Sequence, residues 1–563
     1  MSDAQSTPAT APAAPLLRAA RGTHPEQVFC NGSILTMDGP APKYVEALVI
    51  SGGTIVFVGD ESTARERFPA AEPRDLDGAA LLPGFIDAHS HFSAAFDLAD
   101  RVNVGPPSLG HCTDIATVLQ TLEAFRVSRS IGPGEWLIGY GYDQEALTEN
   151  RHITVNDLDA LFPDALVMLV HVSSHGAVLN SAALQWAGIN ATTQTPSGGV
   201  IARLPGSQDP AGLLMETAYM NLVVSKLPVL SPGDKLRLLD AAQQDYASQG
   251  YTHAQDGFVT VADLDLYQSA AAGGLLYLDI AVLGSFMEAP QWLGNPKYPT
   301  GSYSDGFKIA GLKVLQDGSP QGRTAYMRSP YLTGGLDGQA DWCGEPMMPF
   351  ESFAALVQGT LMHGVQLYTH VNGDAAIDQL IRAVEQTGTT AADDLRTVAI
   401  HSQFQHPEQL ADYVRLGITP SYFTNHTFFW GDVHRANTGE GRAAFISPLK
   451  SALEKGLVVS NHSDFPVTAL NPFFMIFTAT NRTTRSGNIL GPHERVSGYQ
   501  ALRALTTGPA FQLFEEHRKG MLKVGMLADL VMLDVDPLTA VADAVKDIQV
   551  LETIKEDVTV FRR

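Results

Sequence analysis

Cysteine is scarce in this sequence: its 563 residues include three, Cys30, Cys112 and Cys343. Three distant cysteines provide neither the paired framework of a disulfide-stapled domain nor the spacing of a cysteine-rich zinc site. Residues 1–24, rich in Ala, Pro, Ser and Thr, lack the basic start and the apolar core of a secretory leader. We therefore expect a reducing, cytoplasmic setting and a disordered tail over residues 1–24.

Basic residues and long apolar runs are scarce as well. Lys and Arg total 37 against 60 Asp and Glu, which gives a formal net charge of −23. A chain of this charge repels phosphate backbones and anionic lipid surfaces, and no apolar run is long enough to cross a bilayer. These absences predict no nucleic-acid partner and no membrane partner.

What the sequence does contain is enough apolar residues, 45% of the chain, for a large folded core. A chain of this length favours one large domain together with a smaller one. Eight short apolar stretches separated by segments of helical spacing predict an α/β protein built on a (β/α)8 TIM-like barrel. We expect the barrel strands near residues 81–89, 250–256, 276–284, 308–317, 365–371, 397–403, 417–423 and 456–464.

Short β-like segments occur at both ends of the chain. EALVISGGTIVFVG, with its central Gly-Gly, predicts a hairpin, and ADLVMLDVDP and DVTVFRR predict further strands. We expect residues 25–80 and 520–563 to be two parts of one small β domain beside a barrel domain over residues 81–519. The gap of about 160 residues between the first two barrel strands is too long for an ordinary connection. Residues 101–249 are therefore predicted to be an inserted subdomain, or lid, over the barrel mouth.

The stretch LLPGFIDAHSHF ends in two histidines, His89 and His91. Side chains alternate along a strand, so both histidines point the same way and can reach one metal ion. Taken alone, the pair is also consistent with two ordinary histidines at a strand edge. Four other expected strands also end in polar residues, at the rim where barrel active sites are built: Lys313, His370, His401 and Asp464.

The motifs PGFIDAHSH, LKVLQDGSPQGRTA, THVNGDAAI, IHSQ and HSDFPVTALNPF together resemble the amidohydrolase superfamily, in particular its family 3 branch, which contains the N-substituted formamide deformylases. The resemblance covers essentially the whole chain after the tail, including HVSSHGAVLNS and GLLMET in the insertion. It implies a metal-dependent hydrolase of carbon–nitrogen bonds other than peptide bonds. It also implies that the two chain ends form a β-sandwich beside the barrel.

The resemblance implies a set of metal ligands, namely His89, His91, Lys313, His370, His401 and Asp464, with Asp464 and His401 as candidate catalytic residues. Neutral imidazole suits zinc, and we expect zinc, with one or two ions per chain. A buried lysine can lose its charge and react with carbon dioxide, so a carbamate on Lys313 is expected to bridge two metals, as in the family's binuclear members. An ion pair between Lys313 and Asp317 or Asp305 is the structural alternative.

Asp464 ends an apolar run, where a carboxylate is costly unless it binds metal or is strongly hydrogen-bonded. The resemblance implies that metal-bound hydroxide attacks the amide, and that Asp464 takes a proton from the water and returns it to the leaving amine. The predicted partner is a small-molecule amide, an N-formyl or N-acyl amine. Hydrolysis of a cyclic amide, carbamate or ester is a second hypothesis, and a catalytically inactive barrel that serves as a scaffold is a third.

Residues near the expected ligands extend this hypothesis. His175 and Arg323 are expected to bind substrate, although packing for His175 and a salt bridge within its loop for Arg323 are structural alternatives. Three further histidines lie near strand ends, where they can support the ligands: His253, His426 and His462. Barrels of this family often form dimers, so a homodimer is also expected.

Overall fold

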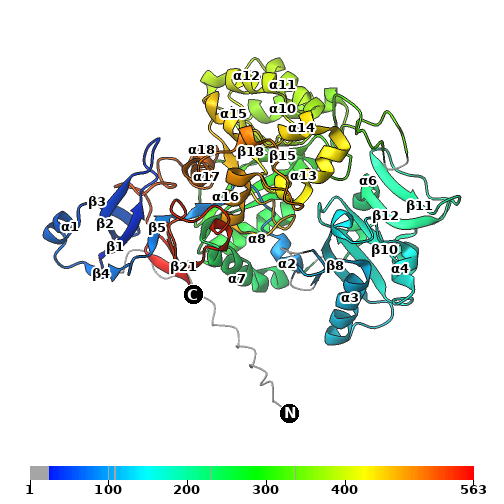
Figure 1. Ribbon diagram of the computed structural model, residues 1–563, viewed down its shortest axis with the longest axis horizontal. Coiled ribbons are helices and arrows are strands. Elements are labelled where there is room, and N and C mark those ends of the chain that lie inside the picture. The colour runs from blue at the N-terminus through cyan, green and yellow to red at the C-terminus, as the bar shows by residue number, and fades with distance from the viewer. Residues whose placement is uncertain (1–24, 99–100, 107–109, 229, 336–337) are drawn as a thin grey trace, which may run out of the picture.

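The computed structural model describes residues 25–98, 101–106, 110–228, 230–335 and 338–563. The predicted tail, residues 1–24, lies outside these ranges. The described strands form three sheets: a barrel sheet in the middle, a terminal sheet from both chain ends on one side, and an inserted sheet on the other (Figure 1). None of the described helices is long and apolar enough to cross a membrane.

The barrel sheet has eight strands, and all neighbouring strands run parallel. In sheet order they are β6 (Phe85–Ile86), β13 (Tyr251–Val259), β14 (Asp279–Ser285), β15 (Phe307–Leu315), β16 (Gln366–Val371), β17 (Val398–His401), β18 (Thr419–Tyr422) and β19 (Ser460–Asn461). Each strand falls within or overlaps one predicted stretch, so the predicted α/β barrel fold is confirmed. Between β6 and β19, the carbonyls of Ala504 and Leu505 accept hydrogen bonds from the N–H groups of Asn461 and Ile86.

The predicted first barrel strand, residues 81–89, is divided between two sheets. Its first half is β5 (Ala80–Pro83), which belongs to the terminal sheet, and β6 follows after Gly84. A Cβ on Gly84 would lie 2.4 Å from Cγ2 of Thr252 on β13, so a larger residue would clash with the barrel wall. The chain therefore changes sheet at this glycine before it reaches the two histidines.

Helices surround the barrel sheet and bury their apolar sides against it, as α11 does with Ile377, Leu380, Ile381 and Val384 at three- and four-residue spacing. The helices of this part are α2 (Ala94–Leu98), α7 (Pro232–Ser248), α8 (Val261–Ala272), α9 (Ala289–Trp292), α10 (Phe350–Met362), α11 (Asp374–Gln386), α12 (Pro407–Leu416), α13 (Asn425–Thr438), α14 (Glu440–Ala444), α15 (Leu449–Glu454), α16 (Pro472–Asn481), α17 (Gly498–Arg503) and α18 (Thr507–Gln512).

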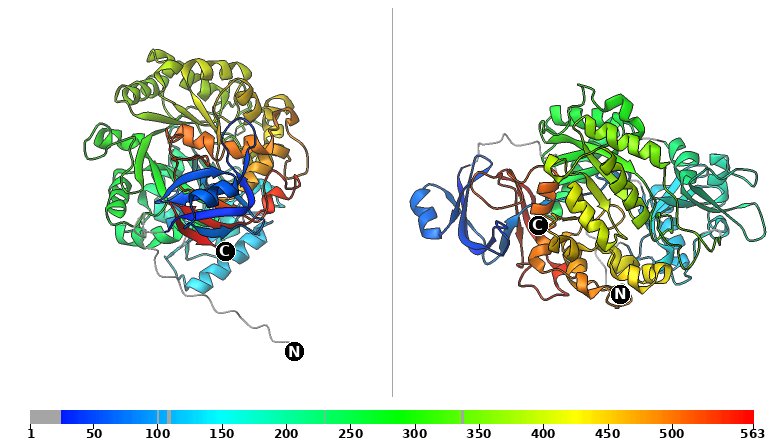
Figure 2. Two further views of the ribbon diagram at one scale, coloured as in Figure 1. Left: turned by 90° about the vertical axis from the view of Figure 1, so that its left-hand side faces the viewer. Right: turned by 90° about the horizontal axis from the view of Figure 1, so that it is seen from above.

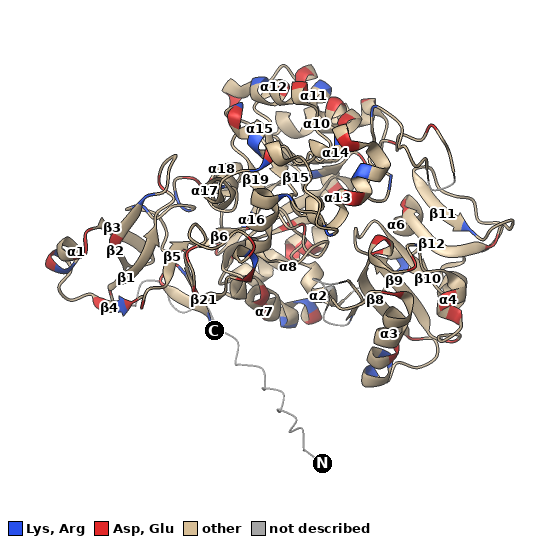
Figure 3. Ribbon diagram, viewed as in Figure 1, with Lys and Arg blue, Asp and Glu red and all other residues tan. Residues whose placement is uncertain are grey.

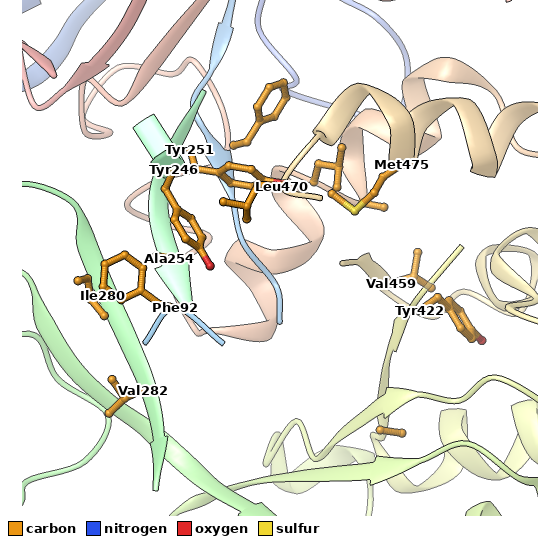
Figure 4. Close-up of a cluster of buried hydrophobic side chains, with 14 of the residues drawn as sticks. Phe92, Tyr246, Tyr251, Ala254, Ile280, Val282, Tyr422, Val459, Leu470 and Met475 are labelled. Atoms are coloured by element: carbon orange, nitrogen blue, oxygen red, sulfur yellow. The ribbon is translucent and has the colours of Figure 1, made fainter. Parts of the chain in front are cut away.

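One large apolar core fills the space between the barrel strands and these helices. Figure 4 shows Phe92, Tyr246 and Tyr251 side by side in this core, where the ring centroids of Phe92 and Tyr246 are 5.1 Å apart. Tyr246 lies on α7, and the same helix buries Leu239 and Ala242. Helix α7 thus packs into the barrel core, although it lies within residues 101–249.

The terminal sheet joins the two chain ends in the order β22-β21-β20-β5-β1-β2-β3, and β4 also pairs with β1. Its strands are β1 (Gln27–Leu35), β2 (Tyr44–Ser51), β3 (Thr54–Gly59), β4 (Glu72–Asp75), β5, β20 (Leu530–Leu533), β21 (Val550–Lys555) and β22 (Val558–Arg562), with α1 (Glu61–Arg67) on one side. Strands β5 and β20 pair antiparallel, with Leu82 opposite Val531. The two ends therefore share one hydrogen-bonded sheet.

The inserted sheet has the order β11-β12-β10-β9-β8-β7. Its strands are β7 (Val102–Asn103), β8 (Trp136–Tyr142), β9 (Leu166–His171), β10 (Gly176–Leu179), β11 (Gly199–Arg203) and β12 (Pro210–Glu216), with helices α3 (Ile115–Arg129), α4 (Val155–Asp159), α5 (Ser181–Ala187) and α6 (Thr217–Leu222). Figure 2 shows that this part and the terminal sheet lie at opposite ends of the molecule.

Buried charges join the terminal sheet to the barrel. At the start of β14, the carboxylate of Asp279 contacts Lys519 and lies 3.1 Å from Nζ of Lys555 on β21. All three side chains are almost fully buried. Elsewhere, basic and acidic residues lie close together along surface helices such as α11 and α12 (Figure 3), for example in the pair Arg415 and Glu385.

Candidate metal centre

Barrel strands bring the predicted ligands to one edge of the barrel. His370 and His401 lie near the ends of β16 and β17, and Lys313 lies near the end of β15. The other three predicted ligands lie in the segments that follow β6 and β19. All six line one cavity of about 380 Å³ between the barrel and the insertion: His89, His91, Lys313, His370, His401 and Asp464.

His89, His91 and Asp464 form the tightest group in this cavity. Each offers one ligand atom, and these atoms all lie within 4.8 Å of one another. Oδ1 of Asp464 is 3.4 Å from Nε2 of His89 and 3.6 Å from Nε2 of His91. This oxygen is buried and has no hydrogen-bond partner among the described residues. Two imidazoles and an unpaired carboxylate oxygen are a donor set that fits a divalent metal such as zinc.

The tautomer of His89 is set by Gln255 on β13. Nδ1 of His89 lies 2.9 Å from the amide oxygen of Gln255, which can only accept, so Nδ1 donates. Nε2 therefore presents its lone pair to the cavity, where it accepts a hydrogen bond from Nζ of Lys313 at 2.9 Å. Fixing a ligand ring through its other nitrogen is the usual role of such an outer partner.

Lys313 is almost fully buried beside this group. Burial lowers the pKa of its ammonium to about 7, against an opposite effect of the Asp464 carboxylate. Asp317, one proposed pairing partner, instead accepts hydrogen bonds from the backbone N–H groups of Tyr326, Asn372 and Gly373. Burial thus favours the uncharged amine of Lys313.

His370 and His401 form a second pair of nitrogens in the cavity. Nδ1 of His370 and Nε2 of His401 are 3.1 Å apart, so one of them must present a lone pair to the other. Nδ1 of His401 bonds Nε2 of His462 at 3.1 Å, and Nδ1 of His462 bonds the hydroxyl of Ser421 at 2.9 Å. Burial holds the pKa of both His401 and His462 below the ordinary value for histidine. For His401, the neighbouring His370 lowers the pKa further.

The carboxylate of Asp464 remains ionised in this setting. Burial would raise its pKa, but contacts with His91, His401 and His89 outweigh burial and hold the pKa well below its usual range. The backbone φ angles of Asp464 and His401 are +52° and +71°. Left-handed angles cost a residue with a side chain about 1–3 kcal/mol, and such residues cluster at functional sites.

The roof of the cavity comes from the insertion and is mostly apolar. Its lining includes Tyr140 on β8, Val170 on β9, Met220 on α6 and Val224 just after α6, and Phe258 of the barrel also lines the cavity. A group bound at the metal-ligand side of the cavity would therefore extend into apolar surroundings.

His175, predicted to bind substrate, lines the same cavity. Its ring centroid is 5.5 Å from that of His370, and its Nδ1 lies 2.9 Å from a carboxylate oxygen of Glu216. Burial lowers the pKa of His175, but the Glu216 carboxylate more than compensates and leaves the pKa raised.

Arg323 is not brought to this cavity. Its guanidinium donates to the carbonyls of Thr333 and Gly334, and it lines a second cavity of about 170 Å³ together with His152 and Gln321. The placement of Arg323 therefore does not support the predicted contact with substrate. Its hydrogen bonds to nearby carbonyls are closer to the structural alternative, in which Arg323 is bonded within its own loop.

Some residues of the site were not predicted from the sequence. Gln255 has no neighbouring motif that marks it, and Glu216 lies within the GLLMET motif, which does not reveal that its carboxylate contacts His175. Asn372 lies within the THVNG motif, and its amide group lies 3.0 Å from Nε2 of His370. Of the three histidines proposed as supports, His462 contacts a predicted ligand, whereas His426 bonds His434 and both nitrogens of His253 have no partner among the described residues.

Comparison with known proteins places these features in a family context. The sequence profile of the amidohydrolase family matches residues 72–561. The chain is 29% identical to N-substituted formamide deformylase of Arthrobacter pascens over 547 residues, which is 95% of this chain and 98% of that protein.

Solved structures resemble the fold. An uncharacterized metal-dependent hydrolase from Pyrococcus furiosus superposes with a TM-score of 0.70 at 23% identity, covering 91% of this chain and 100% of that one. A second, from Pyrococcus horikoshii OT3, superposes with a TM-score of 0.72 at 21% identity over 92% of this chain and 99% of that one. Both similarities support the fold alone.

Proposed function

The chain belongs to the amidohydrolase family and is a metal-dependent hydrolase of carbon–nitrogen bonds, and from this premise we propose that it hydrolyses N-formyl or short N-acyl amines. The observation that carries the proposal is the group of His89, His91 and Asp464 at the bottom of an apolar-roofed cavity. The resemblance to a formamide deformylase over nearly the whole chain supports the same substrate class.

Zinc is the metal we propose for this group, because two neutral imidazoles and a carboxylate suit it. When bound, a divalent metal supplies an activated water and polarises the scissile carbonyl. His89 and His91 hold the metal, and Gln255 keeps the ring of His89 in the required tautomer. The carboxylate of Asp464 takes a proton from the attacking water and returns it to the leaving nitrogen.

A second metal would be held by His370 and His401, with Lys313 between the two groups. We propose that the neutral amine of Lys313 reacts with carbon dioxide, forming an N–C bond and releasing one proton, and that the resulting carbamate would serve as an additional anionic ligand. The lowered pKa of Lys313, caused by its burial, supports this step because the reaction requires the uncharged amine.

The substrate proposal rests on the lining of the cavity. The carbonyl end of the substrate lies at the metal group, where His175 is placed to bind the carbonyl oxygen. The N-substituent extends toward the apolar roof formed by residues such as Met220 and Val224. A volume of about 380 Å³ suits a small molecule rather than a folded protein.

Mass spectrometry of reaction products tests the proposal. Zinc-supplemented protein is incubated with N-formyl amines, longer N-acyl amines, N-acyl amino acids, cyclic amides, carbamates and esters. We expect turnover of the formyl and short acyl amines, with the free amine and the acid as products. His91→Asn should lose metal and turnover, whereas His363→Asn, an exposed histidine outside the cavity, should keep both.

Turnover confined to esters, carbamates or cyclic amides would contradict the substrate class and leave the family assignment in place. A metal-loaded protein that turns over none of the panel would also contradict the substrate class. Full activity of His91→Asn would show that the metal group is placed elsewhere.

A further inference from the structure

Glu216 is a buried carboxylate behind His175, outside the lining of the metal cavity, and it is not among the predicted ligands. The residue is 4% exposed and ends β12, at the point where the insertion meets the barrel. One carboxylate oxygen accepts from Nδ1 of His175 at 2.9 Å, and the other accepts from the hydroxyl of Thr324 at 2.7 Å. Both oxygens are thus engaged by groups on opposite sides of the domain boundary.

His175 is held by Glu216 at two points. Besides the ring contact, the backbone N–H of Glu216 donates to the carbonyl of His175 at 2.7 Å. A carboxylate only accepts, so Nδ1 of His175 carries the proton and the ring cannot flip without losing this bond. The position of the imidazole is therefore fixed relative to the backbone that bears it.

The conformation of Glu216 is strained, and its surroundings are fitted to it. Its φ and ψ angles are +52° and −129°, a region that residues with side chains rarely adopt. Gly318 faces it from the barrel, where an added Cβ would lie 2.7 Å from the Glu216 carboxylate. Strain of this kind persists only where surrounding contacts over-determine it, as the bonds from His175 and Thr324 do here.

The other ring nitrogen of His175 is unused. Nε2 bonds no other described residue, while the ring lines the cavity 5.5 Å from the ring of His370. When the ring carries a proton on Nε2 as well as on Nδ1, Nε2 can donate a hydrogen bond to the oxygen of a carbonyl bound at the metal group. Fixed donors aimed at such an oxygen are a strong contributor to hydrolysis of acyl compounds.

We propose that Glu216 is a positioning residue, which acts through His175 by holding its ring with Nε2 toward the scissile carbonyl oxygen. The inference rests on the proposed function, because it assumes an acyl substrate at the metal group. The competing role for Glu216 is purely structural, as a bridge through Thr324 between the insertion and the barrel.

A double-mutant cycle separates the two roles. Glu216→Gln keeps the shape of the side chain but removes its charge, and His175→Ala removes the ring. We expect each single variant to lower kcat by about 10- to 100-fold with a smaller change in KM, and the double variant to lose no more than His175→Ala alone. Thr324→Val removes the hydrogen bond between Thr324 and Glu216 but leaves that between Glu216 and His175, so it should lower kcat by less than threefold.

Glu408→Gln is the matched control, because Glu408 is an exposed glutamate beside a histidine, His406, outside the cavity. It should leave kcat and KM unchanged. The positioning role would be overturned if the two single reductions in kcat multiplied in the double variant. It would also be overturned if Thr324→Val lowered kcat as much as Glu216→Gln does. Wild-type activity of Glu216→Gln would overturn it as well.

A second readout does not depend on turnover. NMR of protein with ¹⁵N-labelled histidine, with the His175 signal identified by its loss in His175→Ala, should show Nδ1 protonated in the wild type and a mixture of tautomers in Glu216→Gln. An unchanged His175 signal would contradict the inference even if no substrate had been found. If wild type hydrolyses no panel substrate while the signal changes as expected, the proposed function fails and the positioning of the ring stands.

Discussion

Single hydrogen bonds decide which nitrogen each histidine presents to the cavity. Gln255 accepts a hydrogen bond from Nδ1 of His89, and Glu216 accepts one from Nδ1 of His175. In both rings Nε2 is left to face the cavity. The chemistry of the site therefore depends on two residues that touch neither the proposed metal nor the proposed substrate.

Asp464→Asn tests the proton transfer. Asparagine keeps an oxygen for the metal but cannot take a proton from the attacking water, so kcat should fall by about 10²- to 10⁴-fold. Steady-state kinetics with a panel substrate measure the effect, with metal content determined by plasma mass spectrometry. Asp378→Asn, which alters an exposed pair with Arg328, is the control and should retain wild-type kcat. An unchanged rate in Asp464→Asn with full metal content would mean that another group handles the proton.

Lys313→Ala tests the proposed carbamate. Removing the amine removes the carbamate ligand, so we expect bound metal to fall from two ions per chain to one and turnover to fall with it. In the wild type, two-ion loading should require dissolved carbon dioxide. It should increase from pH 6 to pH 8, because the pKa of Lys313, lowered by burial to about 7, makes the amine neutral over that range.

Metal analysis after reconstitution in buffers with and without bicarbonate measures both effects. Lys450→Ala removes an exposed lysine and should load like the wild type. The carbamate would be ruled out if Lys313→Ala bound two metal ions per chain. It would also be ruled out if two-ion loading of the wild type did not depend on bicarbonate.

The sequence predicts the candidate metal ligands better than the residues around them. His89, His91, Lys313, His370, His401 and Asp464 were predictable because each is polar at the end of an apolar strand, where burial needs a chemical reason. Their convergence on one cavity agrees with that prediction, and their separate roles remain proposals. Glu216 also ends an apolar strand, but its role could not be predicted, because its partners His175 and Thr324 are distant in the sequence.

At the scale of elements, the barrel strands were predictable because parallel strands buried on both faces are continuous apolar runs. The exception is the first strand, which is divided at Gly84 between the terminal sheet and the barrel. An apolar run alone does not reveal which of two sheets each half joins. Helix α7 illustrates the same limit, since its apolar spacing says that it is buried but not whether it packs in the insertion or in the barrel.

Asp279→Asn tests the charged junction between strands β14 and β21. Burial raises the pKa of Asp279, but Lys519 and Lys555 outweigh burial and leave the pKa depressed. A depressed carboxyl pKa stabilises the fold above the unfolded-state pKa of about 4, and this stabilisation is lost as the pH falls toward the folded-state value. The variant leaves two buried lysines with less opposing charge and should lower the free energy of unfolding by about 3–5 kcal/mol at pH 7.

Urea unfolding followed by tryptophan fluorescence, at pH 7 and at pH 3.5, measures this difference. The difference in the free energy of unfolding between the wild type and Asp279→Asn should be smaller at pH 3.5, because the wild type then loses part of the stabilisation from the Asp279 carboxylate. Asp412→Asn alters an exposed carboxylate paired with Arg415 and should have little effect at either pH. A difference that grew on acidification would contradict the assignment of Asp279 as an ionised partner.

At the scale of the whole molecule, the terminal sheet depends on both chain ends. A chain that stops at residue 519 lacks β20, β21 and β22, so β5 loses its antiparallel partner. The apolar cluster around Leu81 also loses Leu530 and Ile554. We expect this truncated chain to aggregate, because unpaired edges and apolar patches associate.

Sedimentation of lysates and size-exclusion chromatography of the recovered protein measure this outcome. Co-expression of residues 520–563 should restore part of the soluble fraction, because these residues supply the missing strands. A soluble, monomeric chain of residues 1–519 with wild-type unfolding behaviour would contradict the prediction.

The pairing of β5 with β20 also sets an order of events during synthesis. Leu82 and Val531 face each other across about 450 residues of intervening chain, and at 5–20 residues per second the ribosome needs roughly 20–90 s to make that interval. Throughout that time β5 has no partner on one edge, while the following residues of the same segment already begin the barrel. The nascent chain thus carries an open β-edge until its last few dozen residues emerge, and we expect chaperones that shield such edges to matter more for its yield than for its final stability.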